Sequence, residues 1–285
     1  MVLIYNIARN GLLRLILVLF IYVGFYAQHT ALAVEEPTSS NNNNSSIIET
    51  VSGDYKSFYA GDRLIRMGIV FGAAGIAANT NIDMSIRNWY QDNVRSSRTD
   101  SWSSSSRNVS SDLTAKFFGE GKYMVPVALL AASVNSISTD TAIGNWGANA
   151  SRAYIVGLPA MWFTQGALGA TRPGDRPEGS SWGTPFSASN GVSGHAFVGA
   201  VPFLTIAYMN PDNKFVKYTA YVASAATTWS RINDDAHFPS QALLGWYMGW
   251  EAVDAVFENN QKKKGVTVAP MAGLDGFGLM ASGSW

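Results

Sequence analysis

The chain has 285 residues, 47% of them hydrophobic and 14% charged, which is enough apolar material for the core of one ordinary domain. Lysine plus arginine and aspartate plus glutamate each number 20, so charge gives no argument for nucleic acid or an anionic membrane surface as a partner. The absence of cysteine excludes disulfides, thiolate metal sites, cysteine nucleophiles and a lipid anchor on cysteine.

The first 33 residues have the pattern of an export signal. Arg9 and Arg14 precede the apolar run Leu15 to Ala27, and Ala31-Leu32-Ala33 has the small-x-small form of a cleavage site. Because a membrane span needs about 20 apolar residues, this shorter run favours a removed signal peptide over a retained anchor. We expect a signal peptide over residues 1–33 and an exported protein, either periplasmic or envelope-associated.

Two polar stretches predict solvated segments. Residues 34–54 include the run Asn41 to Asn44 flanked by serines, and they offer no face to bury, so we expect a flexible leader. Ser101 to Ser106, broken only by Trp102, predicts a loop that follows a helix around Ile82 to Val94.

Residues 55–264 predict an all-α domain. The apolar segments are rich in alanine and glycine and have the length of helices. They are Arg63 to Ala78, Tyr123 to Val134, Ala153 to Leu168, Ala196 to Met209, Lys217 to Trp229 and Ala242 to Phe257. Glycines such as Gly68, Gly72 and Gly75 predict close helix packing. A multi-span membrane protein is the alternative, but segments of about 12 to 16 residues are short for spans, which favours a globular bundle.

The tail, residues 265–285, differs from the rest of the chain. Gly265 to Met271 and Phe277 to Trp285 flank a Gly-Leu-Asp-Gly sequence, which predicts a candidate short β-hairpin. A local cover over the bundle is the favoured purpose, and an outer-membrane contact is the alternative.

Two motifs carry the candidate chemistry. Ser193-Gly194-His195 leads directly into an apolar helical run, so the free N–H groups at the start of that helix can bind an oxyanion. Further along, Ser230-Arg231 is followed by His237. The chain has three histidines, and the third, His29, lies in the expected signal peptide. Two histidines in such settings favour a paired acid and nucleophile over two structural residues.

At these residues the chain resembles the type 2 phosphatidic acid phosphatase superfamily, which includes bacterial acid phosphatases, lipid phosphate phosphatases and vanadium haloperoxidases. The family pattern is a lysine, six residues and Arg-Pro, then Pro-Ser-Gly-His, then Ser-Arg, five residues, His, three residues and Asp. Arg172-Pro173 fits the first motif, Ser193 to His195 the second, and Ser230 to His237 the third. The resemblance implies the helical bundle of that superfamily over residues 55–264.

Three positions depart from the family pattern. Gln165 stands at the lysine position, Val192 at the proline before the serine, and Gln241 at the closing aspartate. A glutamine at 165 can still donate to a phosphate oxygen, although more weakly than a cation, since charge-assisted hydrogen bonds are about twice as strong. The amide oxygen of Gln241 can still accept from the ring of His237, without the negative charge that stabilises an imidazolium.

The resemblance implies a role for each residue. His237 attacks phosphorus to give a phosphohistidine, His195 protonates the leaving oxygen, and Gln241 orients His237. The residues implied in binding phosphate are Gln165, Arg172, Ser193, Gly194 and Arg231. No metal and no cofactor is required. Asp234 and Asp235, beside the third motif, are expected to be solvated loop charges.

The favoured function is an exported phosphatase that hydrolyses a phosphomonoester or a lipid-linked phosphate or pyrophosphate. Its partner is the phosphate ester, with a peripheral membrane contact in the case of a lipid phosphate, and no nucleic acid. One alternative is a vanadate-dependent haloperoxidase with vanadate bound through His237, against which Gln165 argues. Another is a non-catalytic phosphate-binding envelope protein with a degenerate site, for which the glutamines at 165 and 241 are the evidence.

Overall fold

The computed structural model describes residues 47–104, 114–138, 140–175, 181–263, 267–273 and 276–282. The expected signal peptide and residues 34–46 of the expected leader lie outside these ranges. Within the ranges the fold is all-α apart from one hairpin, as the sequence predicts. No helix there combines the length and hydropathy that crossing a bilayer requires.

The helices follow one another along the chain with short connections. They are α3 (Ile47–Phe58), α4 (Gly61–Ala78), α5 (Ile82–Asn93), α6 (Ser97–Ser103), α7 (Gly121–Ser133), α8 (Ala142–Ala167), α9 (Gly194–Met209), α10 (Lys214–Ser224), α11 (Ala226–Asn233) and α12 (Pro239–Lys263). Short 3-10 turns cover Phe117–Gly119 and Val134–Ser136. Strands β1 (Thr267–Gly273) and β2 (Gly276–Ser282) pair antiparallel, from Thr267 opposite Ser282 to Gly273 opposite Gly276.

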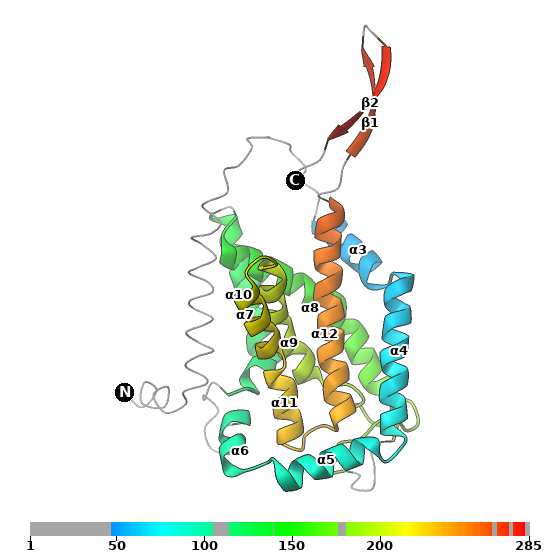
Figure 1. Cartoon of the computed structure of the whole chain (residues 1–285), viewed down its shortest axis with the longest axis vertical. Coiled ribbons are helices and arrows are strands. Elements are labelled where there is room, and N and C mark those ends of the chain that lie inside the picture. The colour runs from blue at the N-terminus through cyan, green and yellow to red at the C-terminus, as the bar shows by residue number, and fades with distance from the viewer. Residues whose placement is uncertain are drawn as a thin grey trace, which may run out of the picture.

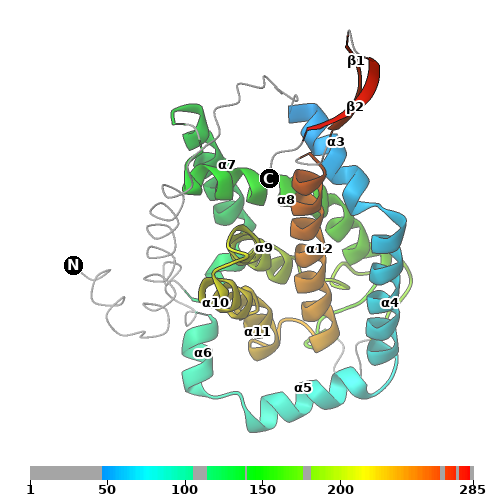
Figure 2. The ribbon, with the colours of Figure 1, turned by 45° about the horizontal axis from the view of Figure 1, so that its top comes forward.

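Helix α9 lies at the centre of the bundle and packs against α8, α10, α11 and α12 (Figures 1 and 2). Every residue from Ala196 to Ala207 is buried. A helix that is apolar on all sides is stable only in the interior of a protein, which explains its central place. The start of this helix carries the Ser193 to His195 motif, so the core itself fixes the position of that motif.

Two prolines inside the central helices are compensated by tyrosines. Proline cannot donate to the carbonyl four residues before it, so Pro202 leaves the oxygen of Val198 without its helical partner. The hydroxyl of Tyr154 in α8 donates to that oxygen at 2.9 Å. In the same way Pro159 frees the oxygen of Ile155, to which Tyr55 in α3 donates at 2.8 Å. These bonds tie α8 to α9 and α3 to α8.

Close helix contact depends on a glycine that the sequence analysis did not single out. A Cβ added at Gly245 in α12 would lie 2.2 Å from the backbone oxygen of Ser193, so only glycine allows α12 to approach the start of α9. Of the glycines expected to mediate packing, Gly75 meets the ring of Trp182, but Gly68 and Gly72 face open space. The prediction of close packing is therefore wrong for these two positions.

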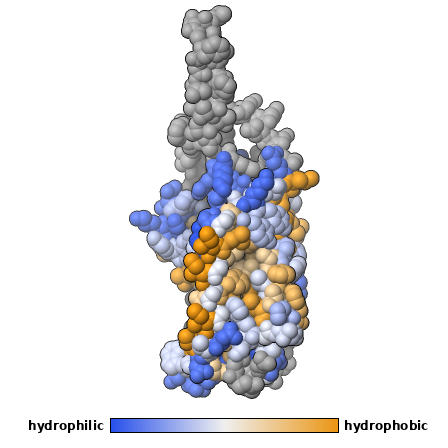
Figure 3. All heavy atoms as spheres, turned by 90° about the vertical axis from the view of Figure 1, so that its right-hand side faces the viewer, coloured by the Kyte–Doolittle hydropathy of each residue, from blue (hydrophilic) through white to orange (hydrophobic). Residues whose placement is uncertain are grey.

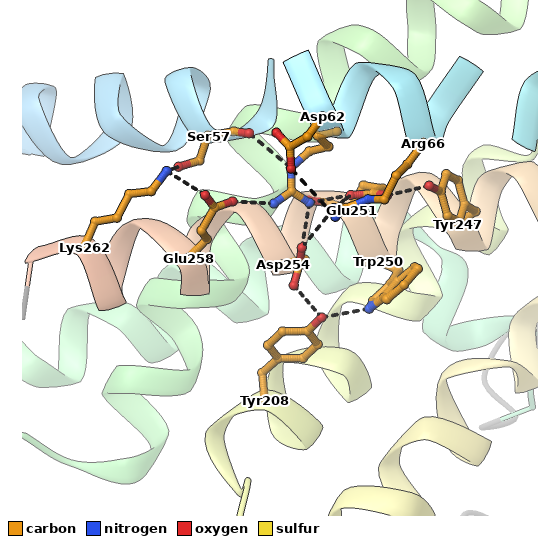
Figure 4. Close-up of polar contacts among 11 residues, drawn as sticks. Ser57, Asp62, Arg66, Tyr208, Tyr247, Trp250, Glu251, Asp254, Glu258 and Lys262 are labelled. Carbon is orange, nitrogen blue, oxygen red and sulfur yellow. Dashed lines mark hydrogen bonds and ion pairs between the residues drawn. The ribbon is translucent and has the colours of Figure 1, made fainter. Parts of the chain in front are cut away.

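A buried ion cluster joins α4 to α12 (Figure 4). Arg63, only 1% exposed, donates to three carboxylates of α12, at 2.8 Å to Asp254, 2.7 Å to Glu258 and through a short bond to Glu251. Arg66 and the hydroxyl of Tyr247 add donors to Glu251. A buried guanidinium needs such charged partners, because burying it unpaired is costly. We call this cluster the Arg63 clamp.

The outer face of α4 is apolar and exposed. Ile65, Ile69 and Ile76 are 67%, 68% and 63% exposed, and residues 67–78 contain no polar side chain. Figure 3, which looks at the side of the molecule where α4 lies, shows hydrophobic residues gathered on this face. The opposite face of α4, including Val70, Phe71 and Ala74, packs on the core.

Three boundaries differ from the sequence-based expectations. Residues 47–54 of the expected leader belong to α3, where buried Asp54 forms an ion pair with Arg152 of α8. The single helix expected over Lys217 to Trp229 is broken at Ala225 into α10 and α11. There the hydroxyl of Ser224 donates to the carbonyl of Tyr221 and accepts from the indole of Trp246, and this tertiary contact ends α10.

The expected serine loop is also shorter at its start. Helix α6 ends at Ser103, and its N-cap Ser96 forms a capping box with Thr99 that starts the helix. Ser103 is fully buried rather than solvated. Residues 105–106 of the expected loop lie outside the described residues.

Candidate functional site

The Ser193 motif begins α9. Ser193 is the N-cap, and its hydroxyl accepts from the backbone N–H of Ala196 at 3.3 Å. Its own N–H donates to the backbone oxygen of Gln241 at 2.9 Å, which joins the motif to α12. Within the described part of the chain, the N–H groups of Gly194 and His195 have no acceptor. These donors, at the positive end of the helix dipole, can bind an anion.

The His237 ring is oriented by Gln241. The amide oxygen of Gln241 lies 3.1 Å from Nδ1 of His237 and also accepts the N–H of Phe238 at 3.2 Å. The amide nitrogen donates to the backbone oxygen of Thr171 at 2.9 Å. One end of the amide thus faces a group that can only donate, and the other end faces one that can only accept. This pairing fixes the amide orientation, so Nδ1 of His237 carries the hydrogen.

Burial and positive neighbours keep His237 neutral. The residue is 5% exposed, and desolvation lowers its pKa from the ordinary 6.5 to about 3. The charges of Arg172, Arg231 and His195 lower this pKa further, while the hydrogen bond from Gln241 opposes them. The groups that the sequence motifs select therefore converge on one region. Its Nε2 has no hydrogen-bond partner among the residues described.

Arg231 is buried beside that ring and is held on one side only. Its Nε and Nη2 donate to the hydroxyl of Ser230, and Nη2 also donates to Asp234 at 2.6 Å. Burial lowers the pKa of Arg231, with Asp234 and Glu120 opposing, but a guanidinium stays protonated in proteins. No described residue accepts from Nη1, so this nitrogen is available to an anion. The expectation that Asp234 is a solvated charge is wrong.

Arg172 and Gln165 approach the region from the connection after α8. Arg172 is exposed, its Nε donates to the side chain of Asn190 at 2.9 Å, and its charge lowers the pKa of both His237 and Arg231. The amide of Gln165 donates to the backbone oxygen of Val192 at 2.9 Å. Gln165 thereby holds the residue that leads into Ser193.

Glu120 is a member of the region that the sequence motifs do not include. Its carboxylate lies 3.5 Å from Nε2 of His195 and within reach of Lys116. Burial and the charge of Arg231 lower the pKa of His195, whereas Glu120 raises it. A Cβ added at neighbouring Gly119 would lie 2.6 Å from the backbone oxygen of His195, so this glycine lets Glu120 come close.

Residues 142–264 match the family model described as the PAP2 superfamily. No curated protein and no solved structure matches the chain. The matched region runs from α8 to α12 and contains both histidines and both arginines of the site, whereas Glu120, α5 and α6 precede it. The family acts on phosphate esters, which supports a phosphatase-type function. With the all-α fold and the motif order described above, the chain is a member of the PAP2 superfamily.

Proposed function

We propose that the protein is an exported phosphatase that hydrolyses a phosphomonoester or a lipid-linked phosphate or pyrophosphate through a phosphohistidine on His237. Export is supported by the pattern of residues 1–33, and the catalytic domain is proposed to extend from α3 to α12. A peripheral membrane contact belongs to the lipid-linked form of the proposal.

The orientation of Gln241 is the observation that carries this proposal. Because the amide oxygen faces Nδ1 of His237, the other ring nitrogen is left unprotonated with its lone pair free. The low pKa of about 3 keeps the ring in this nucleophilic form at neutral and moderately acidic pH. A degenerate site would not need an amide held at both ends in the orientation that activates the histidine.

The first chemical step divides among the remaining groups. The free Nη1 of Arg231, Arg172 and the N–H groups of Gly194 and His195 would bind the nonbridging oxygens. Nε2 of His237 would attack phosphorus and form the N–P bond as the bond from phosphorus to the leaving oxygen breaks. Protonated His195 would give its proton to that oxygen, and Glu120 would favour the protonated form.

The second step regenerates the enzyme. Water would attack the phosphohistidine, and the now neutral His195 would take a proton from that water as the N–P bond breaks. Inorganic phosphate leaves, and His237 returns to its neutral form with the proton on Nδ1. The two negative charges of a bound phosphate would offset the repulsion from Arg231 and raise the pKa of His195, so the acid would charge when substrate arrives.

A phosphate-release screen of the mature protein tests the proposal. The panel is a short aryl phosphate, phosphatidic acid and an isoprenyl pyrophosphate, with His237→Ala as the inactive control. We expect release from at least one ester, loss of at least about 1,000-fold in His237→Ala, and acid-labile phosphate trapped on the parent but not on the variant. Added vanadate should inhibit. Peroxidase activity with vanadate, or no turnover and no trapped phosphate on any ester, would overturn the proposal.

A further inference from the structure

The connection from α11 to α12, which carries Arg231 and His237, is held by helices outside the region matched by the family model. Side chains of α5 and α6 contact this connection at successive positions, and α5 and α6 lie together along the end of the bundle where α11 and α12 meet (Figures 1 and 2). We propose that α5 and α6 form a bracket that positions His237 for attack, with Arg87 as its principal positioning residue. The kinetic part of this inference rests on the proposed phosphatase function.

One face of α5 supplies most of the bracket. Asp83, fully buried, accepts the N–H of Ser240 at 2.9 Å and its hydroxyl, so it caps the start of α12 from another helix. One turn further along α5, both ends of the Arg87 guanidinium bind the carboxylate of Asp235. Another turn along, Gln91 donates to the backbone oxygen of Ile232 at 2.8 Å. The helical spacing thus brings three anchors to one connection.

Asp235 shows why Arg87 matters most. Its φ is 55°, a left-handed conformation that is uncommon for residues other than glycine and most accessible to Asp and Asn. Such a conformation persists when surrounding contacts hold it. The bidentate bond from Arg87 is the ion pair that holds Asp235, and both side chains are largely buried, at 20% and 23% exposed. The turn at Asp235 directs the chain into His237, two residues later.

Helix α6 extends the bracket to the arginine. Ser103 donates to the backbone oxygen of Ser230 at 3.1 Å and to the carboxylate of Asp234. Asp234 in turn accepts from Arg231 at 2.6 Å. Asp100 accepts from the amide of Asn233 at 2.9 Å. The same two helices therefore fix the proposed nucleophile and the guanidinium that would bind its target.

Steady-state kinetics of four variants test the bracket. A small displacement of a reacting group costs up to about 100-fold, so Arg87→Ala should lower kcat by about 10- to 100-fold with KM changed by less than about 3-fold. Arg87→Lys should recover part of the loss, because lysine cannot form the bidentate pair. Asp235→Gly should be milder than Asp235→Ala, because glycine adopts a φ of 55° without strain.

Arg152→Ala is the matched control. Arg152 forms a comparable pair with buried Asp54, through Nε at 2.7 Å and Nη2 at 2.5 Å, but it joins α8 to α3 away from the site. It should lower thermal stability and leave kcat of the folded protein within about 2-fold of the parent. If Arg87→Ala behaves like this control, with lowered stability and unchanged kcat, Arg87 is a structural residue and the proposal fails.

A second readout does not require turnover. In the mature protein labelled with nitrogen-15 in histidine, the resonances of His237 are assigned with His237→Ala, and they should report hydrogen on Nδ1. Arg87→Ala should shift or broaden these resonances and leave those of His195 within the variation seen for Arg152→Ala. Unchanged His237 resonances would overturn the bracket, whereas an inactive parent with shifted resonances would overturn only the phosphatase proposal.

Discussion

The amide of Gln241 holds the ring of His237 by its oxygen, 3.1 Å from Nδ1, while its nitrogen holds the backbone of Thr171. The family pattern has an aspartate at this position, which would present an oxygen in both directions. The amide therefore does two tasks, since it sets the tautomer of the histidine and anchors the segment that carries Arg172. An aspartate or glutamate can do only the first without repulsion from the carbonyl of Thr171.

Replacing Gln241 should separate these two tasks. Gln241→Glu keeps an acceptor for the ring but places a second oxygen where the amide nitrogen donates to Thr171, 2.9 Å away. We expect KM for the phosphate ester to rise as Arg172 is displaced. Gln241→Leu leaves the ring without its acceptor, and kcat should fall by about 100- to 10,000-fold, the upper figure matching the loss when a triad aspartate becomes asparagine. If kcat and KM respond alike to both substitutions, the amide has no separate role.

The pH dependence of kcat/KM should have its maximum in the acid range. His237 must be neutral, so activity is lost as pH falls towards its pKa of about 3. His195 must be protonated, so activity is lost as pH rises through a pKa that burial and Arg231 hold below 6.5. Because Glu120 raises that pKa, Glu120→Gln should move the alkaline limb to lower pH and leave the acid limb in place. An unmoved alkaline limb would remove Glu120 from the acid's surroundings.

Folding stability should carry the signature of His237. Between pH 6.5 and about 3 the unfolded chain protonates this histidine and the folded protein does not, so its contribution to stability is complete above pH 6.5 and declines as pH falls. The slope from one such group is at most about 1.4 kcal/mol per pH unit. Urea unfolding at pH 7, 5.5 and 4.5 should therefore show a shallower pH dependence for His237→Gln than for the parent. Equal slopes would mean that the ring is not buried neutral.

Gln165→Lys should strengthen anion binding. The side chain lies beside Gly194, with its amide nitrogen 3.1 Å from where a Cβ on that glycine would stand, and a lysine there adds a charge-assisted donor near the anion site. We expect the inhibition constant of phosphate to fall about 10-fold. Gln165→Met, which loses the hydrogen bond to Val192, should raise it. The same constant in all three proteins would show that position 165 does not reach the anion.

Two glycine substitutions provide a matched test of the packing. Gly245→Ala places a methyl group 2.2 Å from the oxygen of Ser193, and overpacking of this kind costs about 1–3 kcal/mol, equivalent to several degrees in Tm. Gly68→Ala on α4 meets nothing within 4 Å and should stabilise by about 0.5–1 kcal/mol. Thermal melts compare the two variants directly. A neutral Gly245→Ala would contradict the close approach of α12 to α9.

The sequence predicts the parts of the fold that depend on composition and local motifs. The apolar run Ala196 to Met209 coincides with α9 to within two residues, because a helix buried on all sides is apolar on all sides. The spacing of Ser230, Arg231 and His237 likewise survives as a short helix and a turn. Helix α3 was not foreseen, because its stability comes from long-range contacts such as the ion pair between Asp54 and Arg152.

The missing part of the site is the polar support from distant positions. Glu120 lies far before His195 in sequence and belongs to no motif, so only the fold reveals that it faces the imidazole. Asp235, like Asp234, was expected to be a solvated charge, yet it is held by Arg87 across 148 residues. Local polarity predicts exposure well only where no partner arrives from elsewhere in the chain. The family pattern, which begins after these helices, carries no signal for them.

The Arg63 clamp has a consequence for how this lineage can change. Removing the arginine alone would leave Glu251, which is fully buried, without its closest cation, and would also strip a partner from Asp254 and Glu258. Losing a single carboxylate is milder, because two others remain. Mutational drift can therefore enter this cluster only from the acidic side, one step at a time, while the guanidinium is the last member that can be given up.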